Sequence, residues 1–156
     1  MHNLHALDWS HRPATKKGKF WCVPSTLSVL TGLPYATCTE ACVRNGAAST
    51  YGDLEAVGMT QIVLALRDLV PTATVTEVDL AARFPDLKAG PTLRRYMAER
   101  DVDETVYPLL ISVNTHLIAG HRGWLGGNDV KRPRPVSMFP QLTRNVNWVG
   151  VVRGLP

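Results

Sequence analysis

Apolar residues recur at helical spacing through the first two thirds of the chain. The clearest case is a stripe that predicts a helix over 59–70, with Pro71 as its stop. The stripe consists of Ile62, Val63, Leu66 and Leu69. One face of this segment is therefore expected to pack in a core.

Three further helices are expected, and two of them end at a glycine that can adopt the left-handed cap conformation. The predicted segments are a short buried helix that begins near Pro24 and stops at Gly32, 35–45 with a stop at Gly46, and 91–100. A single helical turn is expected over 79–84 and a loop over 47–58.

The last third of the chain changes to short β-prone runs that are separated by turn residues. These runs predict strands over 106–114, 116–121 and 146–152, and an earlier β-prone run covers 72–78. Helices followed by strands indicate an α+β fold, in which N-terminal helices pack on a C-terminal antiparallel sheet. We expect one domain over 1–156, which begins with an irregular arm over 1–18.

The composition is that of an ordinary globular protein, since 45% of the 156 residues are hydrophobic and 19% are charged. A chain of this length buries enough surface to fold without a disulfide or a structural metal. No apolar run approaches the roughly 18 residues of a membrane span. The odd number of cysteines (three) and the polar start over 1–8 predict a reducing, cytoplasmic location without a signal peptide.

Basic residues gather in two segments, although the net charge of +4 is mild. Eight of them lie within 12–19 and 122–134, and the second segment also contains Trp124. Aromatic and basic side chains together can bind single-stranded nucleic acid. Because no recognised binding motif accompanies them, nucleic acid is the minor alternative among the partners.

Two pairs of metal-ligand residue types occur at suggestive spacings. His2 and His5 are three residues apart, and Cys38 and Cys42 are neighbours on the predicted second helix. Each pair supplies half of a site, whereas zinc requires three or four protein ligands. We therefore expect no metal and no cofactor, and we expect the two cysteines to pack in the core.

Cys22 lies at the start of the predicted helix that Pro24 initiates. The free N–H groups and the positive dipole end of a helix stabilise a thiolate, which is the nucleophilic form of cysteine. Cys22 is therefore the candidate nucleophile, and such a residue needs a base that accepts its proton.

His116 is the candidate base, because it begins the apolar strand predicted over 116–121. His121 ends the same segment beside Gly120 and Arg122, where we expect a turn. An odd separation places the two imidazoles on opposite faces of a regular strand, so at most one of them can face Cys22.

A histidine base is commonly oriented by a third polar group that fixes its tautomer. Asn128 and Asp129 follow His116 by 12 and 13 residues, on a plausible return along a neighbouring strand. Adjacent strand residues face opposite ways, so one of the two is expected to contact His116. The sequence leaves open which one.

The segment from Trp21 to Tyr35 resembles the nucleophile helix of small papain-like cysteine peptidases, particularly those encoded by bacteriophages. In that family an aromatic or polar residue and a cysteine precede a helix that ends in Thr-Gly-x-Pro-Tyr, and here Thr31, Gly32, Pro34 and Tyr35 match. The family later has a histidine at the start of an apolar strand and an Asp or Asn after one further turn, which 111–129 also resembles.

The resemblance implies a papain-like core, a triad of Cys22, His116 and Asn128 or Asp129, and attack on an amide or thioester carbonyl of a protein or peptide substrate. A phage origin would place the protein in the host cytoplasm. Papain-like enzymes usually carry a glutamine a few residues before the cysteine, but 15–19 contains none. A lysine of this segment or the Cys22 N–H is the alternative oxyanion donor.

The missing glutamine supports an alternative in which the fold is retained without catalysis. The protein would then be an accessory protein that binds a host or virion protein through its groove and basic rim. The substrate bond and the oligomeric state remain open at this point.

Overall fold

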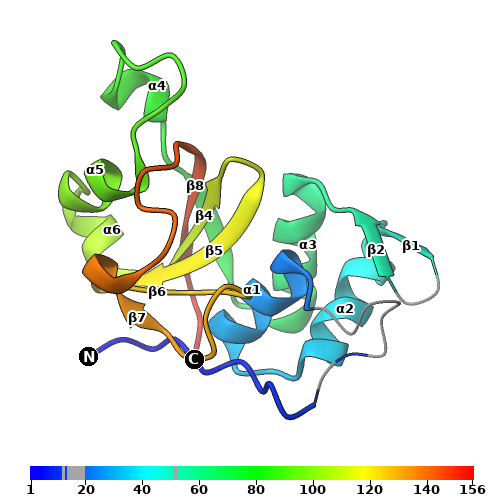
Figure 1. Cartoon of the computed structure of the whole chain (residues 1–156). Coiled ribbons are helices and arrows are strands. Elements are labelled where there is room, and N and C mark those ends of the chain that lie inside the picture. The colour runs from blue at the N-terminus through cyan, green and yellow to red at the C-terminus, as the bar shows by residue number, and fades with distance from the viewer. Residues whose placement is uncertain (12, 14–19, 51–52) are drawn as a thin grey trace.

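Figure 1 shows the computed structural model of the chain, which describes residues 1–11, 13, 20–50 and 53–156. Three helices of the N-terminal half lie together beside a sheet that is built mostly by the C-terminal half. They are α1 (Cys22–Thr31), α2 (Tyr35–Arg44) and α3 (Met59–Leu69). The fold is therefore α+β, with N-terminal helices packed against a six-stranded antiparallel sheet, as predicted.

The sheet has the strand order β3-β8-β4-β5-β6-β7, and every neighbouring pair is antiparallel. Its strands are β3 (Thr74–Glu77), β4 (Leu109–Val113), β5 (His116–His121), β6 (Trp124–Gly126), β7 (Arg134–Pro135) and β8 (Val146–Arg153). The expected strands over 72–78, 116–121 and 146–152 are confirmed to within a few residues. The strand expected over 106–114 is confirmed for 109–113, whereas Val106 ends a short helix.

The two faces of the sheet belong to two hydrophobic clusters. Leu110 and Leu117 pack with the helices α1 to α3, whereas Ile111 and Ile118 pack against the opposite side. That side is covered by the short helices α4 (Leu80–Arg83) and α5 (Leu93–Ala98). The helix α6 (Val102–Val106) is joined to α5 by the hydrogen bond between Glu104 and Tyr96. Because both faces are buried, β4 is apolar almost throughout instead of alternating.

Local signals account for the ends of several helices. Gly32 adopts a φ of 74° and its N–H caps α1 on the carbonyl of Ser28. Thr92 and Asp79 cap α5 and α4, because their side chains accept the N–H groups of Arg95 and Ala82. The helices expected over 24–31, 35–45, 59–70 and 91–100 and the single turn over 79–84 are confirmed to within a few residues.

Two expectations outside the candidate site were wrong. The segment 47–58 contains a hairpin of β1 (Ala48–Thr50) and β2 (Asp53–Ala56), where a loop was expected. His121 is not a turn residue but the last residue of β5, only 3% exposed. Its Nδ1 accepts the N–H of Asn3 and its Nε2 faces the carbonyl of Val106, so that both polar atoms are satisfied inside the protein.

The described part of the N-terminal arm, residues 1–11 and 13, contains no helix or strand. This arm lies beside α1, and the N–H of His5 donates a hydrogen bond of 2.8 Å to the carbonyl of Val29 in that helix. The rest of the predicted arm, 12 and 14–18, lies outside the described residues. Across the described ranges, no helix is long and apolar enough to cross a membrane.

Candidate active site

Cys22 is the first residue of α1, as predicted. Trp21 precedes the helix in an extended conformation and provides no side-chain cap. The first N–H groups of α1 are therefore available to a nearby negative charge. The thiol is half-buried and forms no disulfide, and it interacts with His116 and with the backbone of Leu117 and of Cys22 itself, each of which lowers its pKa.

His116 is held at the end of a tight hairpin. Asn114 and Thr115 both have positive φ angles, 49° and 69°, which is the conformation of a two-residue turn of type I′. Val113 and His116 close the turn as a strand pair. The imidazole thus projects from the first position of a rigid strand, where sequence reasoning had placed it.

Asp129 is the partner of His116, so the structure resolves the choice that the sequence had left open. Its Oδ2 lies 2.6 Å from Nε2 of His116, and both side chains are 21% exposed. Because Nε2 faces Asp129, Nδ1 is the ring nitrogen that remains for the thiol. Asp129 lies in a turn directly after β6 and not within a strand, contrary to expectation.

Asn128 does not contact His116. Its Nδ2 donates a hydrogen bond of 2.9 Å to the carbonyl of Phe20, two residues before the nucleophile. Its Oδ1 is buried and has no partner among the described residues. Asn128 therefore connects the turn after β6 to the chain that enters α1.

Gln141 is a member of the site that sequence reasoning missed. Its Nε2 donates a hydrogen bond of 2.9 Å to Oδ1 of Asp129, the carboxylate oxygen that His116 does not use. The residue has a φ of 71° in the loop before β8, an uncommon backbone conformation for glutamine. A non-glycine residue with positive φ cannot be recognised from sequence, so no local signal marked this position.

Direct contacts between α1 and the sheet fix the position of Cys22 relative to His116. The buried hydroxyl of Thr26 donates a hydrogen bond of 2.9 Å to the carbonyl of Leu117, the residue after the base. At Gly126 an added Cβ would lie 2.9 Å from Cγ1 of Val29, so only glycine permits this close approach of β6 to α1.

The surroundings shift the pKa values of both reacting groups toward an ion pair. Burial by itself raises the pKa of Cys22, but the hydrogen bonds with His116 and Leu117 outweigh it, so that the pKa lies below its ordinary value. The hydrogen bond with Asp129, reinforced by the contact with Cys22, raises the pKa of His116 to about 9. Both shifts favour the ion pair of thiolate and imidazolium over the neutral pair.

The remaining residues singled out from the sequence lie away from this site. Cys38 and Cys42 are fully buried in the core, and burial raises the pKa values of their thiols, to about 12 for Cys38 and about 11 for Cys42. His2 stacks on Trp124 with ring centroids 4.6 Å apart, and this tryptophan is half-buried against the core rather than freely exposed. Among the described residues, no three potential ligands form a metal site.

The lysines considered as oxyanion donors, Lys16, Lys17 and Lys19, lie outside the described residues. The N–H of Trp21 is occupied by the hydroxyl of Tyr35 at 2.9 Å. The N–H groups at the start of α1, beginning with that of Cys22, lie next to the candidate nucleophile and are candidate oxyanion donors. No family of proteins, no curated protein and no solved structure matches this chain.

Proposed function

We propose that the protein is a papain-like cysteine hydrolase that cleaves an amide or isopeptide bond of a protein or peptide substrate. The observation that carries the proposal is the convergence of Cys22, His116 and Asp129 from the start of a helix, a hairpin and a distant turn. A nucleophile, a base and an orienting carboxylate in contact are the arrangement that activates a weak nucleophile.

The reaction follows from the protonation states of these groups. The thiolate of Cys22 attacks the substrate carbonyl, a C–S bond forms, and N–H groups at the start of α1 hydrogen-bond the oxyanion. The imidazolium of His116 then protonates the leaving amine as the C–N bond breaks. In the second half, His116 removes a proton from water, which attacks the thioester and releases the acid.

Asp129 supports both halves of this reaction from behind the imidazole. Its carboxylate accepts a hydrogen bond from the Nε2–H of His116 and stabilises the positive charge on the imidazolium. Gln141 fixes the orientation of that carboxylate through its second oxygen. His116 thus acts as both acid and base, and Asp129 and Gln141 fix its orientation.

The deciding experiment measures the rate of Cys22 alkylation by iodoacetamide against pH, in the wild type and in His116→Ala. Mass spectrometry locates the label, and the buried Cys38 and Cys42 serve as internal unreactive controls. We expect the wild type to react well below about pH 8 and the variant to show an ordinary thiol profile near pH 8.5. Identical ordinary profiles would refute the activated pair and favour the non-catalytic binding protein.

A second measurement distinguishes an activated thiol from a hydrolase. The wild type is mixed with p-nitrophenyl acetate, and the acetylated protein is followed by mass spectrometry. We expect Cys22 to acquire and then lose the acetyl group, because deacylation uses the same histidine. A thioester that persists, or no acylation at all, would contradict the proposal.

A further inference from the structure

One peptide group next to the nucleophile is held from both sides. It joins Phe20 to Trp21, and Cys22 follows directly. Its carbonyl accepts a hydrogen bond of 2.9 Å from Nδ2 of Asn128, and its N–H donates one of 2.9 Å to the hydroxyl of Tyr35. A planar peptide group that is bonded at both its oxygen and its nitrogen cannot rotate without breaking one of these bonds. We call this pair of hydrogen bonds the peptide clamp.

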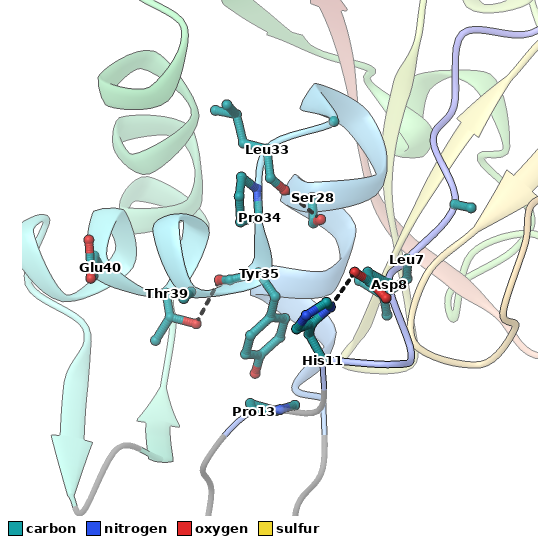
Figure 2. A pocket seen from close by; sticks show the side chains of 13 residues that line it. Leu7, Asp8, His11, Pro13, Ser28, Leu33, Pro34, Tyr35, Thr39 and Glu40 are labelled. Carbon is teal, nitrogen blue, oxygen red and sulfur yellow. Dashed lines mark hydrogen bonds and ion pairs between the residues drawn. The ribbon is translucent and has the colours of Figure 1, made fainter.

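The two side chains of the peptide clamp come from distant parts of the chain. Tyr35 is the first residue of α2, and Figure 2 shows its ring extending away from the bend between α1 and α2. The same ring meets the ring of Phe20 edge-on, with centroids 5.0 Å apart. Asn128 lies in the turn after β6, directly before Asp129. One turn therefore bonds both to the peptide before the nucleophile and to the imidazole of the base.

The peptide clamp also determines where the N–H of Cys22 points. Trp21 is extended, with φ −82° and ψ 150°, and its carbonyl accepts the N–H of Ser25 at 3.1 Å. In a trans peptide the N–H points opposite to the carbonyl, so the N–H of Cys22 points out of the start of α1. Trp21 thus lies between two peptide groups that are each fixed by hydrogen bonds, and the direction of the Cys22 N–H is fixed with them.

We propose that Asn128 and Tyr35 are positioning residues for acyl transfer, which clamp the peptide before Cys22 and thereby hold the Cys22 N–H on the oxyanion. This inference rests on the proposed hydrolase function, because an oxyanion forms only when the thiolate attacks a carbonyl. A donor that is fixed in advance needs no reorganisation when the negative charge develops. Asn128 and Asp129 then have complementary tasks, since one fixes the nucleophile and the other the base.

The test compares two reactions of the same thiol. Iodoacetamide forms a C–S bond as iodide leaves, and no oxyanion appears. With p-nitrophenyl acetate the C–S bond forms at a carbonyl, whose oxygen carries the negative charge until p-nitrophenolate leaves. Both reactions require the thiolate, so the ratio of the acylation rate to the alkylation rate at one pH isolates the oxyanion donor. Mass spectrometry measures both rates on Cys22 of the whole chain.

Tyr35→Phe and Asn128→Ala each remove one bond of the peptide clamp. We expect each variant to lower the ratio of acylation to alkylation about tenfold, because a misplaced donor stabilises the oxyanion less. The pH profile of alkylation should stay that of the wild type. Both side chains hold the same peptide group, so the double variant should lose less than the product of the two single losses.

Tyr107→Phe and Asn45→Ala are the matched controls. Tyr107 packs on the opposite side of the sheet, and Nδ2 of Asn45 donates a hydrogen bond of 2.8 Å to a backbone carbonyl of α2. Both controls should leave the ratio unchanged. If Asn128→Ala does not fold, Tyr35→Phe decides by itself, because it keeps the ring that contacts Phe20.

The two proposals fail in different ways. An unchanged ratio in either folded variant, including one in which acylation and alkylation fall together, overturns the positioning role while the hydrolase stands. A loss in the double variant that equals the product of the single losses overturns the shared action on one peptide. A wild type in which p-nitrophenyl acetate does not acylate Cys22 overturns the hydrolase and the positioning role with it.

Discussion

The protein contains two networks of ionisable side chains, one beside Cys22 and one at the opposite side of the sheet. In the second network, Glu104 accepts hydrogen bonds from Arg83 at 2.7 Å and from the hydroxyl of Tyr96 at 2.8 Å. Glu104 is 3% exposed and Tyr96 is completely buried. Both networks join residues that are distant in sequence, and both shift pKa values.

The two networks differ in whether they contain an accessible nucleophile. Burial raises the pKa of Glu104, but the hydrogen bonds with Arg83 and Tyr96 outweigh it and hold the pKa below its ordinary value. Every charge there already has a partner, and none of its members is a nucleophile. In the other network, the thiol of Cys22 is half-buried, and the side chains of His116 and Asp129 are partly exposed. Perturbed pKa values therefore indicate a reactive site only together with a nucleophile and access.

The largest expected effect belongs to the structural network. Glu104→Ala leaves Arg83 and Tyr96 without their buried partner and should lower the free energy of unfolding by about 3–5 kcal/mol. Urea unfolding measures it, with Glu99→Ala as the control, because Glu99 forms only an exposed ion pair with Arg95. Glu104→Gln serves if the alanine variant does not fold. A shifted pH profile of Cys22 alkylation in the folded variant would show that the two networks are coupled.

Asp129→Ala should have the next largest effect, and it acts on activity. His116 loses the main cause of its raised pKa, so the alkaline limb of ester hydrolysis should move from about 9 toward 6.5. At pH 8 we expect a loss of at least about tenfold. Alkylation of the wild type should persist above pH 9, where the thiolate remains but the imidazolium is lost. An unmoved alkaline limb would remove Asp129 from the mechanism.

The same variant tests the sign of the linkage to stability. A raised pKa of His116 stabilises the fold fully below about 6.5, and this contribution is lost as the pH rises through about 9. The stability difference between wild type and Asp129→Ala should therefore shrink between these values in urea titrations. A difference that grows with pH would contradict the assignment.

Asn128→Ala is the matched comparison, because it changes the neighbouring residue. Removing its hydrogen bond to the carbonyl of Phe20 should cost about 1 kcal/mol of unfolding free energy. The alkaline limb of hydrolysis should stay where it is, because Asn128 does not contact His116. If Asn128→Ala shifts this limb and Asp129→Ala does not, the assignment of the orienting residue is reversed.

The smallest effect is expected for Gln141→Asn. Asparagine tolerates the positive φ of this position, but its amide is one methylene shorter and withdraws from Asp129. We expect hydrolysis to fall about two- to threefold, in line with the loss of one partly exposed hydrogen bond. Gln141→Gly, which also relieves the backbone, should give a similar rate. A rate equal to that of the wild type in both variants would make the contact incidental.

Much of the candidate site follows from local patterns. Cys22 could be placed at a helix start because Pro24 and Gly32 mark the two ends of α1. His116 could be placed at the first position of a strand because apolar residues follow it. The order of Asn128 and Asp129 could not be resolved, since their directions depend on a turn and not on the alternation of a strand.

Other features had no local signal at all. The hairpin of β1 and β2 lies in a segment of small and acidic residues with weak strand propensity. The flanking glycine and arginine made His121 look like a turn residue, although the N-terminal arm covers it in the fold. A pocket is also lined jointly by the N-terminal arm and by residues of α1 and α2, among them Asp8, Ser28 and Tyr35 (Figure 2).

The sequence by itself indicated most of the helices, the long strands of the main sheet and the positions of Cys22 and His116 at the starts of α1 and β5, because periodicity, caps and turns are properties of a short stretch of backbone. Tertiary structure alone decided that Asp129 rather than Asn128 faces His116, that Gln141 supports it, and that Glu104 is buried with its partners. These contacts join residues that are far apart along the chain, and they depend on how α1 and two loops pack against the sheet. No local pattern encodes such packing.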